Sequence, residues 1–119
     1  MIEQTVVDYL SGALTVAVGT QTPKGPPESY VVVERTGGGE KDGLQAAVLA
    51  LRCTSPTLYG AIALCSLASR AMRMLPWSVE NVSGSKIESM YNQTDTSTKE
   101  FRYTVVFRVY YTEDEDAAE

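Results

Sequence analysis

The sequence has 119 residues, 44% hydrophobic and 21% charged, a composition typical of one globular domain. The formal net charge of −5 argues against nucleic acid as a main partner, because phosphate binding requires clustered Lys and Arg. The absence of histidine excludes Ser-His-Asp and Cys-His catalysis and the usual zinc and non-haem iron sites, which need an imidazole.

The chain begins with a predicted helix. Apolar residues at helical spacing predict a helix over Ile2–Leu10, with Gly12 as its left-handed end. Alternation over Leu14–Val18 predicts a short strand, and the prolines of Thr20–Ser29 predict a loop. No basic signal region and no apolar run of the ~20 residues that a membrane span needs is present, so we expect synthesis and retention in a cytoplasm.

Two further strands flank a glycine-rich segment. Tyr30–Thr36 is a β-branched run, and Leu44–Cys53 alternates with both faces fairly apolar, which predicts a central strand or a face hidden in an assembly. Together they predict a hairpin with a loop of about seven residues, longer than the common two to five.

This glycine segment has two possible functions. A phosphate-binding loop needs Gly-x-x-x-x-Gly-Lys-Ser/Thr at the start of a helix, whereas here acidic residues and then a strand follow the glycines. We therefore expect a hairpin tip that contacts another protein and becomes ordered by assembly. The residues predicted to make this contact are Gly37, Gly38, Gly39, Glu40, Lys41 and Asp42.

The main helix is predicted to begin with Ser55 as N-cap and Pro56 at its first position, and to run to about Leu75, where Pro76 stops it. Two apolar stripes leave only a narrow polar face. The first contains Leu58, Ala61, Ile62, Cys65, Ala68 and Met72, and the second contains Gly60, Ala63, Leu64, Leu67, Ala71 and Met74. A helix of this kind is normally buried on two sides, and a partner subunit is a natural source of the second cover. Within the second stripe, the candidates for a surface buried by assembly are Leu64, Leu67 and Ala71.

The C-terminal part is predicted to contain two strands. Val79–Tyr91 has an irregularity at 83–85, a polar turn covers 92–98, and Phe101–Tyr111 has the clearest alternation in the chain. The resulting fold class is α+β: a two-layer sandwich, with a mainly antiparallel sheet of four to five strands and two helices on one face. We expect a single domain over residues 1–112 and an acidic, disordered tail over 113–119 that lacks metal-binding spacing.

The remaining candidate residues favour packing over chemistry. Cys53 and Cys65 have no metal-ligand spacing and are predicted to be buried free thiols. Trp77 is predicted to be a core or interface anchor. The acidic residues form no readable catalytic pair, so no catalytic, cofactor or metal residue is predicted, and we do not expect an enzyme.

Three stretches, YVVVERTGGG, SPTLYGAIALCSLASRAMRMLP and MYNQTDTSTKEFRYTVVFRVYY, resemble tail terminator (tail-completion) proteins of long-tailed bacteriophages and related prophages. The resemblance covers about residues 1–112 in pattern and element order. It implies a compact α/β fold and a homohexameric ring that stops growth of the tail tube and forms the surface to which the head connector docks.

The resemblance therefore implies a structural virion protein at the head-proximal end of the tail, assembled in the host bacterial cytoplasm. Its implied partners are further copies of itself, the major tail tube protein and the head–tail connector, without nucleic-acid specificity or a membrane. The alternatives are another neck component, such as a connector, stopper or adaptor, and a small-ligand-binding or enzymatic α+β domain.

Overall fold

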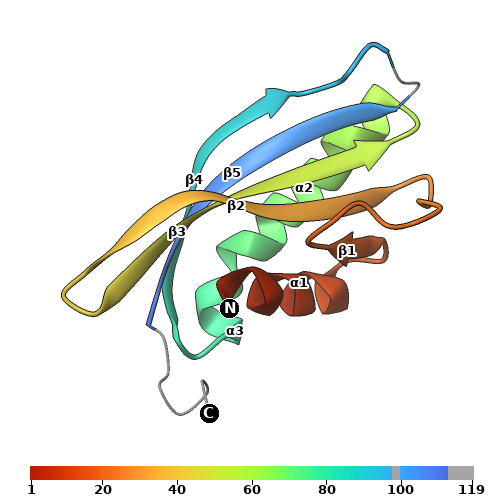
Figure 1. Ribbon diagram of the computed structural model, residues 1–119. Helices are drawn as coiled ribbons and strands as arrows, with labels where there is room; N and C mark the ends of the chain where they lie inside the picture. Colours follow the sequence, from red (N-terminus) through yellow and green to blue (C-terminus); the bar gives the residue numbers. More distant parts are fainter. Residues whose placement is uncertain (98–99, 113–119) are drawn as a thin grey trace.

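The computed structural model describes residues 1–97 and 100–112, which form a five-stranded sheet with helices packed on one face (Figure 1). The elements along the chain are α1 (Ile2–Ala13), β1 (Ala17–Gly19), β2 (Tyr30–Lys41), β3 (Leu44–Ser55), α2 (Leu58–Arg73), α3 (Leu75–Ser78), β4 (Val82–Asn92) and β5 (Phe101–Tyr111). The strand order is β1-β2-β3-β5-β4, and only β1 pairs in parallel. The predicted two-layer α+β sandwich is confirmed, while the acidic segment 113–119 lies outside the described residues.

Helix α1 is longer than predicted and extends to Ala13, and the first strand begins later than predicted, at Ala17. Its buried residues Ile2, Val6 and Leu10 follow the helical period, as the sequence indicates. Gly12 lies inside the last turn, and Leu14 ends the helix in an extended conformation (φ −114°, ψ 156°) with its N–H bonded to the Leu10 carbonyl. Leu14 and Val16 pack against the core in the α1–β1 connection, so β1 itself has only 3 residues.

The β2–β3 hairpin corrects the predicted long loop. Strand β2 continues through the glycines to Lys41, which pairs with Leu44, so only Asp42 and Gly43 form the turn. Their φ angles of 55° and 82° are those of the tight type I′ turn that Asp-Gly favours. A β-bulge between Arg35 and Gly37 shifts the register and allows the glycines to stay paired with β3.

Helix α2 begins two residues later than its predicted N-terminus. Thr57 is the N-cap, and its hydroxyl accepts a hydrogen bond from the Gly60 N–H at 2.9 Å. Ser55, the predicted cap, is instead the last residue of β3. Pro76 does not simply end the helical region, because it lies in the first turn of the short helix α3, a position where its missing N–H costs nothing.

Strands β3 and β5 form the centre of the sheet. Both β3 and β4 are antiparallel to β5, so they run parallel to each other with β5 inserted between them, and α2 connects them. The predicted irregularity in β4 is present as a bulge between Val82 and Gly84, and a second one follows between Ile87 and Ser89. The alternation of β5 is confirmed, because Val105, Phe107 and Val109 are fully buried.

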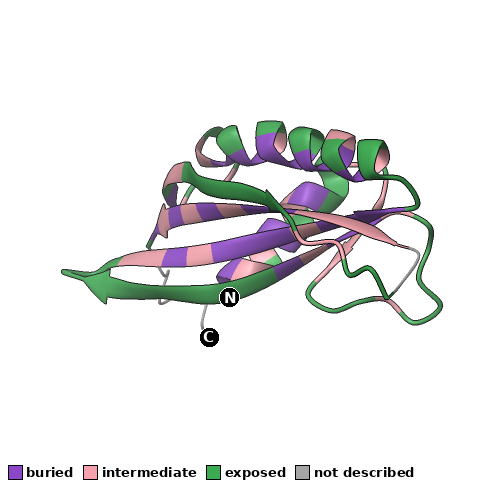
Figure 2. Ribbon diagram, turned by 90° about the horizontal axis from the view of Figure 1, so that it is seen from above, coloured by how far each residue is buried: buried purple, intermediate pink, exposed green. Residues whose placement is uncertain are grey.

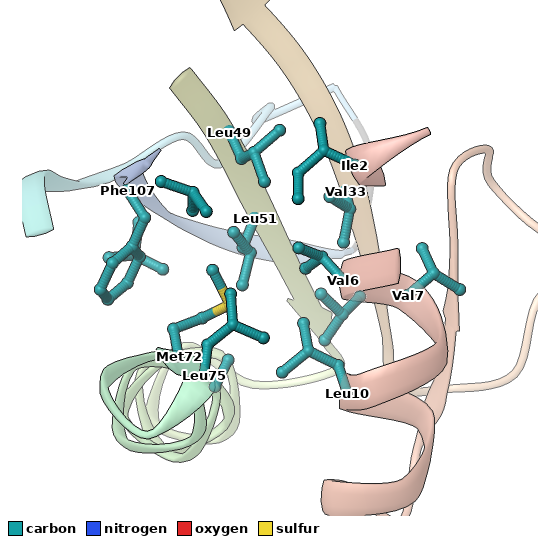
Figure 3. Packing of buried hydrophobic residues seen from close by; sticks show 14 of the residues in the cluster. Ile2, Val6, Val7, Leu10, Val33, Leu49, Leu51, Met72, Leu75 and Phe107 are labelled. Carbon is teal, nitrogen blue, oxygen red and sulfur yellow. The ribbon is translucent and has the colours of Figure 1, made fainter. Parts of the chain in front are cut away.

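The core lies between the sheet and the helices. Figure 3 shows Val6 and Leu10 of α1 and Met72 of α2 pointing toward Leu51 and Phe107 of the sheet. Each such side chain contributes about 1.5–3 kcal/mol by leaving water. Figure 2 shows the same division, with buried residues on the inner side of α2 and exposed residues on its outer side. The two cysteines are buried and free, as predicted.

Candidate functional site

The first candidate surface is the hairpin tip, residues 40–44, which lies at one extreme of the molecule (Figures 1 and 2). All five residues of the hairpin tip are exposed, and Leu44 keeps 41% of its surface accessible. Glu40, Lys41 and Asp42, three of the predicted contact residues, lie here, and none forms an ion pair with another residue in the described part of the chain. The hairpin tip therefore presents charges and one apolar side chain that the subunit itself does not use.

The glycines lie behind the hairpin tip, in the strand ladder. Gly37, Gly38 and Gly39 pair with residues 48, 47 and 46 of β3. A Cβ on Gly38 would lie 2.0 Å from the Ala46 carbonyl oxygen, and its φ of +129° is one that other residues rarely adopt. A Cβ on Gly39 would meet no atom within 4 Å. Gly38 is thus required by close approach of two backbones, and the hairpin tip is carried on paired strands.

The second candidate surface is the α2 groove, an open, mainly apolar groove of about 550 Å³ between α2 and the end of α1. Its walls come from α2 on one side and from the α1–β1 connection on the other. The residues lining the α2 groove are Ala13, Leu14, Thr15, Val16, Ser29, Ser55, Gly60, Ala63, Leu64, Leu67, Arg70 and Ala71. The second apolar stripe of the predicted helix therefore does line one continuous surface feature.

The three residues predicted from that stripe have different environments. Leu64 is only 7% exposed and belongs to the chain's own core, whereas Leu67 is 52% exposed. Ala71 is half-buried, and its carbonyl accepts a hydrogen bond of 2.7 Å from the Tyr9 hydroxyl of α1. Helix α1 thus supplies part of the second cover that was expected from a partner, which leaves Leu67 as the free apolar side chain of the three.

The charge around the α2 groove is positive. Helix α2 contains Arg70 and Arg73 and no acidic residue. Both arginines are exposed, and neither forms an ion pair within residues 1–97 and 100–112. By contrast, Arg52 pairs with Glu34 at 3.0 Å on the sheet. Arg70, the charged residue that lines the α2 groove, is thus not neutralised by an ion pair, and its charge is opposite in sign to that of the hairpin tip, where Glu40 and Asp42 outnumber Lys41.

Two aromatic side chains outside the α2 groove are also exposed. Trp77 is 78% exposed, so it is not a core residue, and its predicted role as an interface anchor stays a prediction. Tyr59 is 84% exposed at the start of α2. Leu14 and Val16 were missed as groove residues, because their alternation indicated a strand of the core.

The opposite face of the sheet carries a polar recess of about 300 Å³ that includes Tyr30, Arg52, Thr54 and Arg102. The Thr54 hydroxyl and the Arg102 Nε have no hydrogen-bond partner among the described residues. Both atoms are covered by protein, so neither is presented to a ligand entering the recess.

The described residues contain no group of three or more His, Cys, Asp or Glu placed to hold a metal. None of the helices in this part of the chain has the length and hydropathy of a membrane span.

Comparison with known proteins gives a structural likeness only. No protein-family model matches this sequence, and a search of curated proteins found no match. Among solved structures, a chain from the virion of a native gene transfer agent particle is similar, with a TM-score of 0.59 and 14% sequence identity. The similarity covers 91% of this chain and 84% of that chain. At 14% identity the comparison shows that the two chains share a fold, and that this fold occurs in a virion.

Proposed function

We propose that this protein is a structural subunit of a tailed bacteriophage or a phage-like particle, without an enzymatic role. The observation that carries the proposal is the fold shared with a virion chain along nearly the whole length of both chains. The two candidate surfaces support it, because a subunit that works by assembly needs exposed surfaces that its own fold leaves unused.

We further propose the specific role of tail terminator, a ring of six copies that caps the tail tube, ends its polymerisation and offers the docking surface for the head connector. The resemblance of residues 1–112 to tail terminators supports this choice among virion proteins. The partners would then be other copies of the chain, the major tail tube protein and the connector, all within the tail at its head-proximal end.

The test is deletion of the gene from its phage or prophage, followed by electron microscopy of the lysate. Loss of a terminator should give tails of uncontrolled length that carry no heads. Loss of a stopper or adaptor should instead give tails of normal length without heads. Normal infectious particles after deletion would contradict any structural role.

Complementation with two matched variants links this function to the α2 groove. Leu67→Glu places a charge in the α2 groove, whereas Ile62→Glu places the same charge elsewhere on α2, at a side chain that is 39% exposed and does not line the groove. We expect Ile62→Glu to restore normal tails and Leu67→Glu to fail, with unchanged circular dichroism for both proteins. Equal complementation by both variants would show that the α2 groove is not needed for the function of the protein in the tail.

A further inference from the structure

The hairpin tip and the α2 groove carry opposite charges and one exposed leucine each, and we propose that they bind each other between neighbouring subunits. The hairpin tip of one copy inserts into the α2 groove of the next copy. This inference rests on the ring proposed above and names the contact by which one subunit is joined to the next.

The two surfaces lie at opposite ends of the subunit. Leu44 of the hairpin tip begins β3, and Ser55, which lines the α2 groove, ends it. A strand of 12 residues spans about 36 Å at roughly 3.3 Å per step, most of the 44 Å longest dimension of the molecule. A subunit therefore cannot place its own hairpin tip in its own α2 groove, so the contact joins two copies, and within the proposed ring it joins them head to tail.

The hairpin tip is narrow enough for a groove. Its turn has only two residues, and one of them, Gly43, has no side chain. The larger side chains of Glu40, Lys41 and Leu44 lie next to the turn. Behind them Gly38 and Gly39 face Ala47 and Ala46, so there both strands carry little side-chain volume. The α2 groove, at about 550 Å³, has room for several side chains.

The chemistry of the two surfaces also matches. Leu44 at 41% exposure and Leu67 at 52% are apolar side chains that each subunit leaves in water. Glu40 and Asp42 bring two carboxylates to the tip against the single charge of Lys41, and Arg70 lines the α2 groove on a helix without acidic residues. Insertion would bury the two leucines together and bring the carboxylates to the unpaired guanidinium.

A mixing experiment tests the head-to-tail geometry. Leu44→Glu damages the hairpin tip and Leu67→Glu damages the α2 groove, so each variant alone should be monomeric by mass photometry while wild type forms rings. An equimolar mixture should give heterodimers and nothing larger, because only one intact tip and one intact groove can meet. Each variant must retain the wild-type circular dichroism spectrum.

Cross-linking tests which surfaces touch. The native cysteines are buried, so a bismaleimide should react with introduced cysteines alone. The double variant Glu40→Cys with Arg70→Cys should give a ladder of covalent multimers on a denaturing gel. The control Glu40→Cys with Ile62→Cys uses a helix position outside the α2 groove and should give at least tenfold less product.

The outcomes separate this contact from the ring itself. If wild type stays monomeric at every concentration and no variant cross-links, both the ring and the contact are wrong. If wild type forms rings that survive both glutamate variants, or that cross-link equally through Ile62→Cys, the ring stands and the tip-in-groove contact is wrong. Oligomers larger than dimers in the mixture would also overturn the head-to-tail contact.

Discussion

Replacement of Gly38 by alanine should loosen the hairpin tip without unfolding the protein. The new Cβ would lie 2.0 Å from the Ala46 oxygen and 2.9 Å from the Ala47 Cα, so the two backbones must separate until the closest contact exceeds about 3 Å. The φ of +129° adds strain, which for a non-glycine residue is about 1–3 kcal/mol. The least costly relief is to unpair the end of β2 from β3.

The size of the effect follows from what that end of the hairpin buries. Because residues 34–41 of β2 are all exposed, unpairing them sacrifices little apolar burial. A local loss of about 1–3 kcal/mol corresponds to roughly 5–150-fold more opening, and amide exchange in the ladder should accelerate by that factor. The melting temperature should fall by less than about 4 °C, which is the decrease that 1 kcal/mol of global destabilisation would cause.

Hydrogen exchange measured by mass spectrometry gives the assay, and Gly39→Ala is the matched control. It makes the same chemical change one residue away, where the Cβ meets no atom within 4 Å. Exchange in Gly39→Ala should stay within about threefold of wild type, the uncertainty of a few tenths of a kcal/mol expected for a strand glycine. The reasoning is refuted if the two variants exchange alike, or if Gly38→Ala lowers the melting temperature as a global destabilisation would.

Two further predictions concern α2 and the core. Thr57→Ala removes the N-cap hydrogen bond from the Gly60 N–H and should lower the free energy of unfolding by about 1 kcal/mol in urea denaturation. Thr57→Ser keeps a hydroxyl and should retain most of the stability. An unchanged denaturation midpoint for Thr57→Ala would contradict the cap. The thiols of Cys53 and Cys65 should react slowly with iodoacetamide in the native protein and completely in denaturant, because both are buried away from the reagent. The hydrogen bond between the two thiols raises the pKa of Cys53, as does its burial, and lowers the pKa of Cys65, so the protection of Cys65 rests on burial alone. A disulfide between them in the native protein, detected by mass spectrometry, would contradict this expectation.

The elements whose signals are local and strong were predictable from the sequence. The alternation of β5 placed Val105, Phe107 and Val109 in the core, since a strand has only two faces and apolar side chains take the dry one. The apolar character of both faces of β3 predicted a central strand or a face hidden in an assembly, and β3 is central, because it pairs with β2 and β5 on its two sides. The class of fold followed from the order of these elements.

Only the tertiary structure decided the form of the hairpin and the extent of the free groove. Glycines have a low intrinsic preference for strands, so Gly37–Gly39 indicated a loop, yet β3 is held in place by β5 and supplies a complete ladder to pair with. Likewise, the second stripe of α2 was predicted to be covered by a partner subunit. Helix α1 instead covers part of it, with a hydrogen bond from Tyr9 to Ala71, and leaves Leu67 exposed. In both cases the deciding partner is distant in sequence, and local propensity carries no information about which segment will supply it.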